Sequence, residues 1–96
     1  MDDSVLKKVI DDLIRNGVIK LVHPKLSRYV QHQILHADKS VIEEIAKKYN
    51  ILPEEIYNIT TVKIARVLEE MKNVIIIKQP NGNNRYKIND LNDWRK

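Results

Sequence analysis

The chain has 96 residues, of which 43% are hydrophobic and 31% charged, with no cysteine and a formal net charge of +4. This length is that of one domain, and the balance of apolar and charged residues is typical of a folded protein rather than a disordered one. The lack of cysteine excludes disulfide scaffolds, thiolate zinc sites and cysteine nucleophiles. The acidic start does not resemble a signal peptide, and the longest apolar run, residues 74–77, is too short to span a membrane. We therefore expect a soluble, cytoplasmic protein with no membrane partner.

The first predicted element is an amphipathic helix over residues 4–16, because apolar pairs recur there at helical spacing with charged residues between them. Asp3 or Ser4 is placed to cap its start, and Gly17 supplies the left-handed residue that ends it. The β-branched residues 18–22 predict a short strand. Helix and strand together form an N-terminal extension that is a candidate dimerisation element.

Two further helices are predicted next. The first covers residues 24–36 and is opened by Pro24, because proline lacks the N–H that the first turn of a helix leaves unpaired. Its expected buried face consists of Leu26, Tyr29, Val30 and Ile34. The second covers residues 41–49, where Ser40 and Glu43 have the spacing of a capping box.

The chain then leads into a fourth helix. Asn50 suits a left-handed helix end, and residues 52–57 predict a single helical turn opened by Pro53. From the capping residue Thr60, a helix is predicted to about Lys72. Its expected buried side consists of Ile64, Val67, Leu68 and Met71, and its opposite side of Val62, Arg66 and Glu69.

The clearest pattern is a β-hairpin over residues 74–89, because Asn81-Gly82 is the strongest short hairpin signal. With those two residues as the turn, Lys78 lies opposite Arg85. This like-charge pair costs stability in isolation, and a phosphate between the two side chains turns repulsion into attraction. The same register predicts an apolar face of Ile75, Ile77, Tyr86 and Ile88 and a cationic face of Lys78, Arg85 and Lys87.

The net charge is concentrated in the predicted fourth helix and hairpin. Residues 60–89 hold six basic and two acidic residues and sum to +4, whereas the rest of the chain holds 11 of each sign and sums to zero. A basic surface confined to one contiguous third of the chain indicates an anionic partner.

The order of three helices followed by a two-stranded hairpin resembles the winged helix-turn-helix superfamily. Two motifs carry the resemblance: residues 40–49 read SVIEEIAKKY, with the small Ala46 where helices cross closely, and residues 60–68 read TTVKIARVL. The chain departs from the family in the stretch 51–59, which is longer than the usual tight turn, and in its N-terminal helix and strand. The resemblance implies a mainly α fold with a small antiparallel β wing (α+β), a winged helix-turn-helix with an extra N-terminal helix.

The resemblance also implies an organisation and a function. The whole chain, 1–96, is expected to be a single winged-helix domain with an extension over 1–22, a core over 23–89 and a polar tail over 90–96, in which Trp94 folds back onto the body. The expected function is double-stranded DNA binding by a transcriptional regulator, as a homodimer that reads two half-sites.

In this prediction helix 60–72 enters the major groove and hairpin 74–89 contacts the DNA backbone. Arg66 is suited to guanine and Val62 to a thymine methyl group. The helix residues expected at DNA are Thr60, Thr61, Val62, Lys63 and Arg66. The hairpin residues expected there are Lys78, Asn81, Asn83, Asn84, Arg85 and Lys87.

Each of these interpretations has a plainer alternative. Helix 60–72 can be a solvated surface, which Glu69 and Glu70 favour because carboxylates repel phosphates. The basic hairpin can be an edge that deters aggregation. At the level of function, the alternative is a winged-helix protein–protein adaptor subunit of a replication or transcription assembly without direct DNA binding, which the long stretch 51–59 favours.

Metal binding and catalysis have little support in the sequence. His32 and His36 have the spacing that aligns two imidazoles for a metal ion, and His23 lies near the start of the same predicted helix. No cysteine exists, and no acid lies between Lys20 and Ala37 to complete such a site, so this stretch is interpreted as more basic surface. The acidic pairs diverge on helices, and both glycines are explained by turns. We expect no metal, no cofactor, no catalytic residue and no enzymatic activity.

Overall fold

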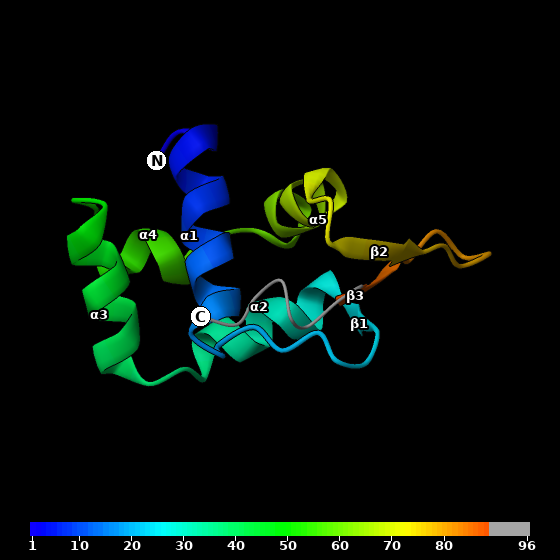
Figure 1. The fold of residues 1–96 in the computed structure, drawn as a ribbon, viewed down its shortest axis with the longest axis horizontal. Coiled ribbons are helices and arrows are strands. Elements are labelled where there is room, and N and C mark those ends of the chain that lie inside the picture. The colour runs from blue at the N-terminus through cyan, green and yellow to red at the C-terminus, as the bar shows by residue number, and fades with distance from the viewer. Residues whose placement is uncertain (89–96) are drawn as a thin grey trace.

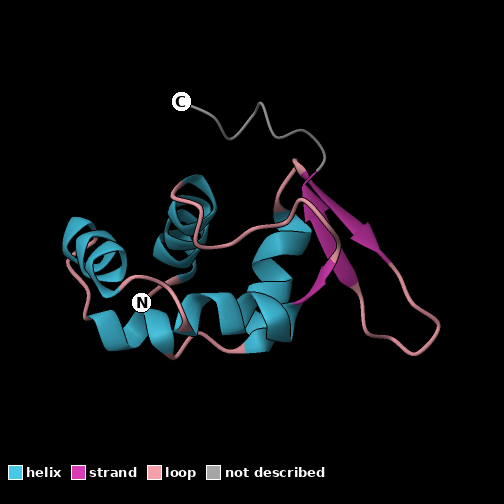
Figure 2. Cartoon of the chain, turned by 90° about the horizontal axis from the view of Figure 1, so that it is seen from below, coloured by secondary structure: helices cyan, strands magenta, loops and turns pink. Residues whose placement is uncertain are grey.

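The computed structural model describes residues 1–88 (Figure 1), so the predicted tail 90–96 with Trp94 lies outside the described residues. The fold is mainly helical with a small antiparallel sheet, which confirms the predicted α+β class (Figure 2). The elements are α1 (Asp3–Arg15), β1 (Lys25–Leu26), α2 (Ser27–Leu35), α3 (Lys39–Lys48), α4 (Pro53–Tyr57), α5 (Thr61–Glu70), β2 (Val74–Ile77) and β3 (Arg85–Ile88). The strand order is β1-β3-β2, so the last strand in sequence is the central one.

Helix α1 is part of the core rather than an added element. Its start is capped by Asp2, whose carboxylate accepts the Val5 N–H at 2.9 Å, in place of the predicted Asp3 or Ser4. Its end is marked by Gly17, which has the expected positive φ of 77°. Its apolar side is almost fully buried within the same chain, through Leu6, Val9, Ile10, Leu13 and Ile14. The apolar side of this candidate dimerisation helix is therefore covered by the domain itself.

A buried polar cluster ties α1 to α3. Asp12 of α1 is 8% exposed, and its carboxylate accepts hydrogen bonds from the Tyr49 hydroxyl at 2.6 Å and the Lys48 ammonium at 3.0 Å. Burial raises the pKa of Tyr49, and the hydrogen bond to Asp12 raises it further. A buried carboxylate is tolerated only with such partners, so the cluster fixes how α1 and α3 pack.

The predicted strand over residues 18–22 is wrong, and a strand forms a few residues later. Residues 18–22 have no regular structure, although Ile19 and Leu21 are buried. Strand β1 pairs instead with β3, where Lys25 lies opposite Tyr86 and Leu26 opposite Arg85. The sequence pattern had assigned both residues to the start of a helix. Pairing across 59 or more residues overrides that local preference, and α2 begins only at Ser27.

The three later helices follow the predicted order with changes at their ends. The capping box at Ser40 is wrong, because α3 already begins at Lys39 and its N-cap is Asp38. Asn50 ends α3 with a φ of 55°, and α4 begins at Pro53, both as predicted. The predicted cap at Thr60 is confirmed by a 3.2 Å hydrogen bond that its hydroxyl accepts from the Lys63 N–H.

Helix α5 packs differently from the prediction. It lies mainly against α2 and also against α1, whereas α3 packs against α4 and α1 (Figure 1). The helix-turn-helix pair that the sequence drew from residues 40–49 and 60–68 is therefore wrong. The stretch from α3 to α4 is inserted between the two helices, α2 and α5, that pack together. One predicted core residue of α2 is also misplaced, because Tyr29 is 50% exposed.

The hairpin forms with a register shifted by one residue from the prediction. Ile77 rather than Lys78 lies opposite Arg85, and Ile76 lies opposite Tyr86. The buried side consequently consists of Val74, Tyr86 and Ile88 with Ile76 partly buried, so the predicted apolar face is right for Tyr86 and Ile88 and wrong for Ile75 and Ile77. Ile75, Ile77, Arg85 and Lys87 share the other face.

The turn explains this shift. It spans residues 79–82, closed by a 3.0 Å hydrogen bond from the Gly82 N–H to the Gln79 carbonyl. Pro80 occupies the second position of the turn and Gly82 the fourth, the preferred positions of a type I turn, and Gly82 has a φ of 82°. Asn81 does not have positive φ, which the predicted Asn-Gly turn requires.

Candidate nucleic-acid interface

Helix α5 presents an outer face to solvent beside the hairpin. Its inner side is buried through Ile64, Val67 and Leu68, as the 3.6-residue period predicts. On the other side Val62 is 74% exposed, and Lys63 and Arg66 are also exposed. The predicted reading residues therefore stand on the surface of the helix.

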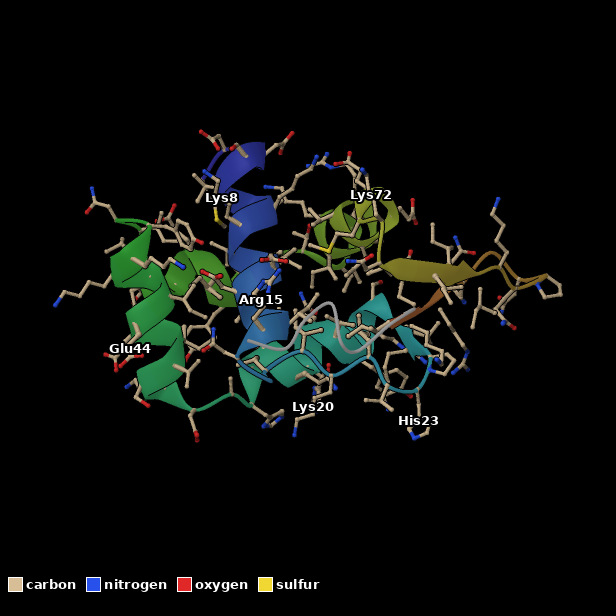
Figure 3. The ribbon with its side chains drawn as sticks, viewed as in Figure 1. Lys8, Arg15, Lys20, His23, Glu44 and Lys72 are labelled. Carbon is tan, nitrogen blue, oxygen red and sulfur yellow. The ribbon has the colours of Figure 1, made fainter. Side chains whose placement is uncertain are left out.

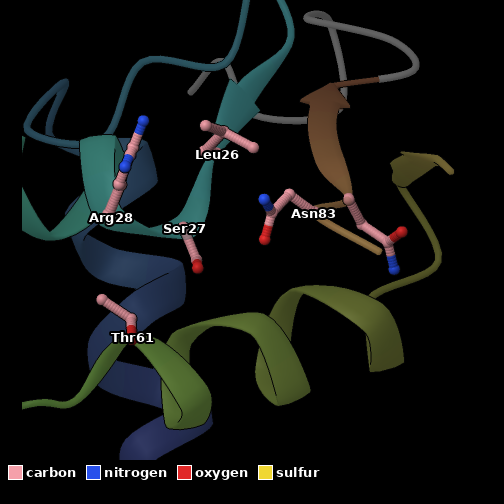
Figure 4. A pocket seen from close by; sticks show the side chains of 6 residues that line it. Leu26, Ser27, Arg28, Thr61 and Asn83 are labelled. Carbon is pink, nitrogen blue, oxygen red and sulfur yellow. The ribbon is translucent and has the colours of Figure 1, made fainter. Parts of the chain in front are cut away.

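A pocket connects the start of α5 to the tip of the hairpin. It has a volume of about 200 Å³ and is lined by Leu26, Ser27, Arg28, Thr61, Asn83 and Asn84 (Figure 4). Ser27 and Thr61 are the first residues of α2 and α5, so the amino-terminal ends of two helices meet at this pocket. Such ends carry unpaired backbone N–H groups and partial positive charge, which favour anions.

A second, shallower depression runs along the outer face of α5. It is lined by Ser27, Thr61, Val62, Ala65, Arg66 and Glu69. Ser27 and Thr61 line both depressions, so the outer face of α5 and the tip of the hairpin border one continuous surface. We call it the α5–wing surface, comprising Leu26, Ser27, Arg28, Thr61, Val62, Ala65, Arg66, Glu69, Asn83 and Asn84.

The acids near this surface are engaged by neighbouring groups. Glu69 accepts a 2.7 Å hydrogen bond from the Tyr86 hydroxyl. Glu70 forms a 2.6 Å ion pair with Lys7 of α1, and this hydrogen bond lowers the pKa of Glu70. Asp3 of α1 forms a 3.1 Å ion pair with Arg66. Part of the repulsion that these carboxylates exert on an anion is thereby offset within the chain.

The predicted cations of the hairpin divide into two kinds. Within residues 1–88, Lys63, Lys78 and Arg85 form no ion pair, and all three are exposed. Lys87 is half-buried, and its ammonium donates a 3.4 Å hydrogen bond to the Ile88 carbonyl. The predicted cross-strand pair of Lys78 and Arg85 is wrong, because Lys78 lies one residue beyond β2.

The asparagines at the tip have different places. Asn81 uses its side-chain oxygen within the turn, where it accepts the Asn83 N–H at 3.0 Å. Asn83 and Asn84 line the pocket next to Thr61. The structure thus brings Thr61, Asn83 and Asn84 together with Arg66 near by, and it leaves Asn81 at the turn itself.

Sequence reasoning missed Ser27 in this surface, because it began the helix at Pro24 and so did not place Ser27 at a helix start. It interpreted the acid-free stretch between Lys20 and Ala37, which contains Arg28, as more basic surface, and the structure places Arg28 at this pocket.

The histidines do not form a metal site in the part of the chain that the structure describes. His32 and His36 lie with ring centroids 4.4 Å apart, and no group of three His, Cys, Asp or Glu side chains placed to hold a metal ion occurs within residues 1–88. No helix in that range is long and apolar enough to cross a membrane. Comparisons with protein-family models, curated proteins and solved structures give no match to this chain.

Proposed function

We propose that the chain is a double-stranded DNA-binding protein of the winged-helix type and that it contacts DNA through the α5–wing surface. The observation that carries the proposal is that the outer face of α5 and the hairpin tip border one surface, at which two helix starts also meet. If the hairpin pointed away from α5, no single surface could contact both a DNA groove and the backbone beside it. Lys78 and Arg85 of the hairpin are exposed, form no ion pair within residues 1–88 and supply positive charge. Lys63 instead lines a different pocket with Glu54 and Glu55.

The arrangement of elements supports the winged type in a modified form. The hairpin of β2 and β3 follows α5 directly, and β1 adds an edge strand beside β3. Helices α1 and α2 support α5, and α3 with α4 form the insertion. In this proposal α5 is the helix that reads the groove, and the helix that packs against it is α2 rather than α3.

Each part of the surface has a chemical task in this proposal. Thr61, Val62 and Arg66 lie on the exposed side of α5 and meet base edges in the major groove. Asn83, Asn84 and the backbone N–H groups at the helix starts bind phosphate oxygens. Lys78 and Arg85 hold the flanking backbone by charge.

The test is a titration of random-sequence duplex DNA at several salt concentrations. The variant Lys78→Ala/Arg85→Ala is expected to flatten the dependence of log K on log salt by about two units. The matched control is Lys39→Ala/Lys47→Ala, which removes the same charge from exposed positions on α3, at the opposite end of the molecule from the hairpin (Figure 1). The proposal would be overturned if the unaltered protein did not bind duplex DNA at low salt. It would also be overturned if the two variants changed the salt dependence equally.

Transcriptional regulation is the role that we propose for this binding. It requires preference for particular sequences, which selection of binding sites from a random duplex pool tests. Selected sites with two repeated half-sites would indicate a dimer, and a single short site would indicate a monomer. Recovery of no enriched sequence would contradict a regulator and leave non-specific DNA binding.

A second candidate function is a protein–protein adaptor. One observation favours it: Val62 is 74% exposed and stands beside Ala65 in a depression on α5, where an apolar side chain of a partner protein fits. The DNA titration separates the two functions, because an adaptor shows no binding to duplex DNA at low salt. If the protein is an adaptor, neither the unaltered chain nor Val62→Asp binds duplex DNA.

A further inference from the structure

We propose that the solvent face of α2, together with the loop before it and His36 directly after it, is a second contact surface for the phosphate backbone of duplex DNA, adjoining the α5–wing surface. The inference rests on the proposed function, since it names more of the surface that the same ligand covers. Its members are Lys20, His23, Arg28, His32 and His36, and all five are exposed. We call this set the α2 strip.

The first observation is the composition of this part of the chain. Residues 13–37 contain four basic residues, all three histidines of the chain and no acid. Arg15 is the basic residue there that is paired, through a 2.8 Å salt bridge to Asp11. The remaining cations form no ion pair within residues 1–88. No acid within this segment neutralises its positive charge.

The second observation is a row along α2. Arg28, His32 and His36 are spaced four residues apart, and positions at this spacing follow one side of a helix. The row is about 12 Å long at 1.5 Å per residue. The rings of His32 and His36 confirm the alignment, with centroids 4.4 Å apart. Each imidazole has an N–H donor even when neutral, so the row offers phosphate oxygens hydrogen bonds as well as the charge of Arg28.

The third observation is that the preceding loop is fastened to α2. Gln33 holds Lys20 with two hydrogen bonds: its side-chain oxygen accepts the Lys20 N–H at 3.2 Å, and its side-chain amide donates to the Lys20 carbonyl at 3.3 Å. Lys20, Gln33 and His36 line one pocket of about 350 Å³. Lys20 and His23 lie along the lower edge of the molecule in Figure 3. The backbone at Lys20 is therefore held beside the row.

The strip ends at defined neighbours. At its first end Arg28 lines the pocket shared with Thr61 and Asn83, so it adjoins the α5–wing surface. At its other end His36 shares its pocket with Asp38, an exposed acid that limits the strip. A duplex bound at the α5–wing surface can continue past Arg28, and it would gain contacts along α2 that the hairpin does not provide.

The chemistry favours a polyanion of repeated phosphates over a single small anion. Within residues 1–88, no buried polar residue belongs to the strip, and the donors are spread along a row, which suits a ligand with charge along its length. Tyr29, 50% exposed with the Arg28 guanidinium 5.3 Å from its ring centroid, helps to hold that side chain at the surface.

The test uses the full chain with two variants and the control Lys39→Ala/Lys47→Ala. Lys20→Ala, which lies outside the α5–wing surface, is expected to flatten the salt dependence of duplex binding by about one unit. His32→Ala/His36→Ala is expected to weaken binding about two- to tenfold, the effect of one or two lost hydrogen bonds. Lys20, His32 and His36 are all exposed, so alanine is expected to disturb the fold little, and circular dichroism tests whether the variants remain folded.

The outcomes separate this inference from the proposed function. If Lys78→Ala/Arg85→Ala weakens binding while Lys20→Ala and His32→Ala/His36→Ala match the control, the α2 strip is wrong and the DNA contact proposed for the hairpin stands. If the α2 variants weaken binding and Lys78→Ala/Arg85→Ala does not, the DNA contact proposed for the hairpin is wrong. Binding to vesicles of anionic phospholipid without binding to duplex DNA would overturn the choice of ligand.

Discussion

Tyr86, on the central strand β3, donates a 2.7 Å hydrogen bond from its hydroxyl to the carboxylate of Glu69 on α5. The Tyr86 side chain is 2% exposed, so the bond links the buried face of the sheet to the edge of the helix. It also holds Glu69, an acid that would otherwise face an approaching phosphate with all of its hydrogen-bonding capacity free. This hydrogen bond thus helps to orient the hairpin against α5, and it reduces the repulsion that Glu69 exerts on an anion at the α5–wing surface.

Tyr86→Phe is expected to reduce the free energy of unfolding by about 1 kcal/mol, the usual effect of removing one hydrogen bond while the ring still fills its place. Urea denaturation measures the change. The control is Tyr29→Phe, since Tyr29 is half exposed and its change is expected to stay within about 0.5 kcal/mol. Equal effects of the two substitutions would show that the bond to Glu69 does not stabilise the fold.

Alkaline pH is expected to destabilise the protein through the same residue. Burial raises the pKa of Tyr86, and the hydrogen bond to Glu69 adds to the rise. Burial also raises the pKa of Tyr49. Because these folded-state pKa values lie above the unfolded value of about 10, the stabilisation is complete below pH ~10 and is lost as the pH rises above it.

The measurement is the free energy of unfolding between pH 8 and pH 11. Tyr49→Phe/Tyr86→Phe is expected to show a shallower decline than the unaltered chain. Some decline remains in the double variant, because the hydrogen bond from Lys48 to Asp12 raises the pKa of Lys48 and its loss acts in the same direction. Parallel curves for the two proteins would show that these phenols do not cause the alkaline loss.

Sequence reasoning succeeded where a local signal decides the structure. The cap at Thr60, the left-handed Asn50 and the start of α4 at Pro53 each depend on residues within four positions, and all three were predicted correctly. The buried side of α5 follows from a single period. The cap at Thr60 and the buried side of α5 determine which residues of α5 face solvent in the α5–wing surface.

It failed where distant parts of the chain decide. Lys25 and Leu26 become a strand only because β3 lies beside them, and no local pattern marks that pairing. The register of the hairpin depended on a choice between two adjacent turns, and the fixed φ of Pro80 favours the one observed. A shift of one residue exchanges the faces of a strand, so this small error moved Ile75 and Ile77 from the predicted core to the outer face.

The role of α1 gives the third prediction. Leu13 is fully buried, and Leu13→Ala is expected to reduce the free energy of unfolding by about 2–5 kcal/mol through lost contacts and a residual cavity. Val5→Ala, at a partly buried position of the same helix, is the milder control. If α1 were a detachable extension, Leu13→Ala would leave the unfolding midpoint unchanged, and a chain without residues 1–17 would still fold.

The polar cluster between α1 and α3 gives the fourth prediction. Asp12→Ala removes the acceptor of both Tyr49 and Lys48, and it is expected to reduce the free energy of unfolding by about 1–3 kcal/mol. Asp12→Asn keeps an acceptor for the Tyr49 hydroxyl and is expected to lose less. Asp11→Ala, one residue earlier, breaks the exposed pair with Arg15 and is expected to cost under about 1 kcal/mol. Equal losses at positions 11 and 12 would show that burial of the carboxylate has no energetic consequence.

The ion pair between Asp3 and Arg66 gives the fifth prediction, which concerns binding. Both side chains are at least half exposed, so the pair contributes little to folding, and Asp3→Asn is expected to change the free energy of unfolding by less than about 0.5 kcal/mol. Under the proposed function, Arg66 must leave Asp3 to meet a base. Removing the carboxylate frees the guanidinium and removes a negative charge beside the DNA, so duplex affinity is expected to rise about two- to fivefold at low salt.

The control is Glu43→Gln, which removes the same charge from an exposed position on α3. The gain at Asp3 is expected to exceed that of the control, to shrink as salt increases and to disappear in the background of Arg66→Ala. A gain that persists without Arg66 would mean that Asp3 acts only through general charge. No gain with Arg66 present would mean that this arginine does not approach the DNA, and the reading face of α5 would then have to be assigned to Thr61 and Val62 alone.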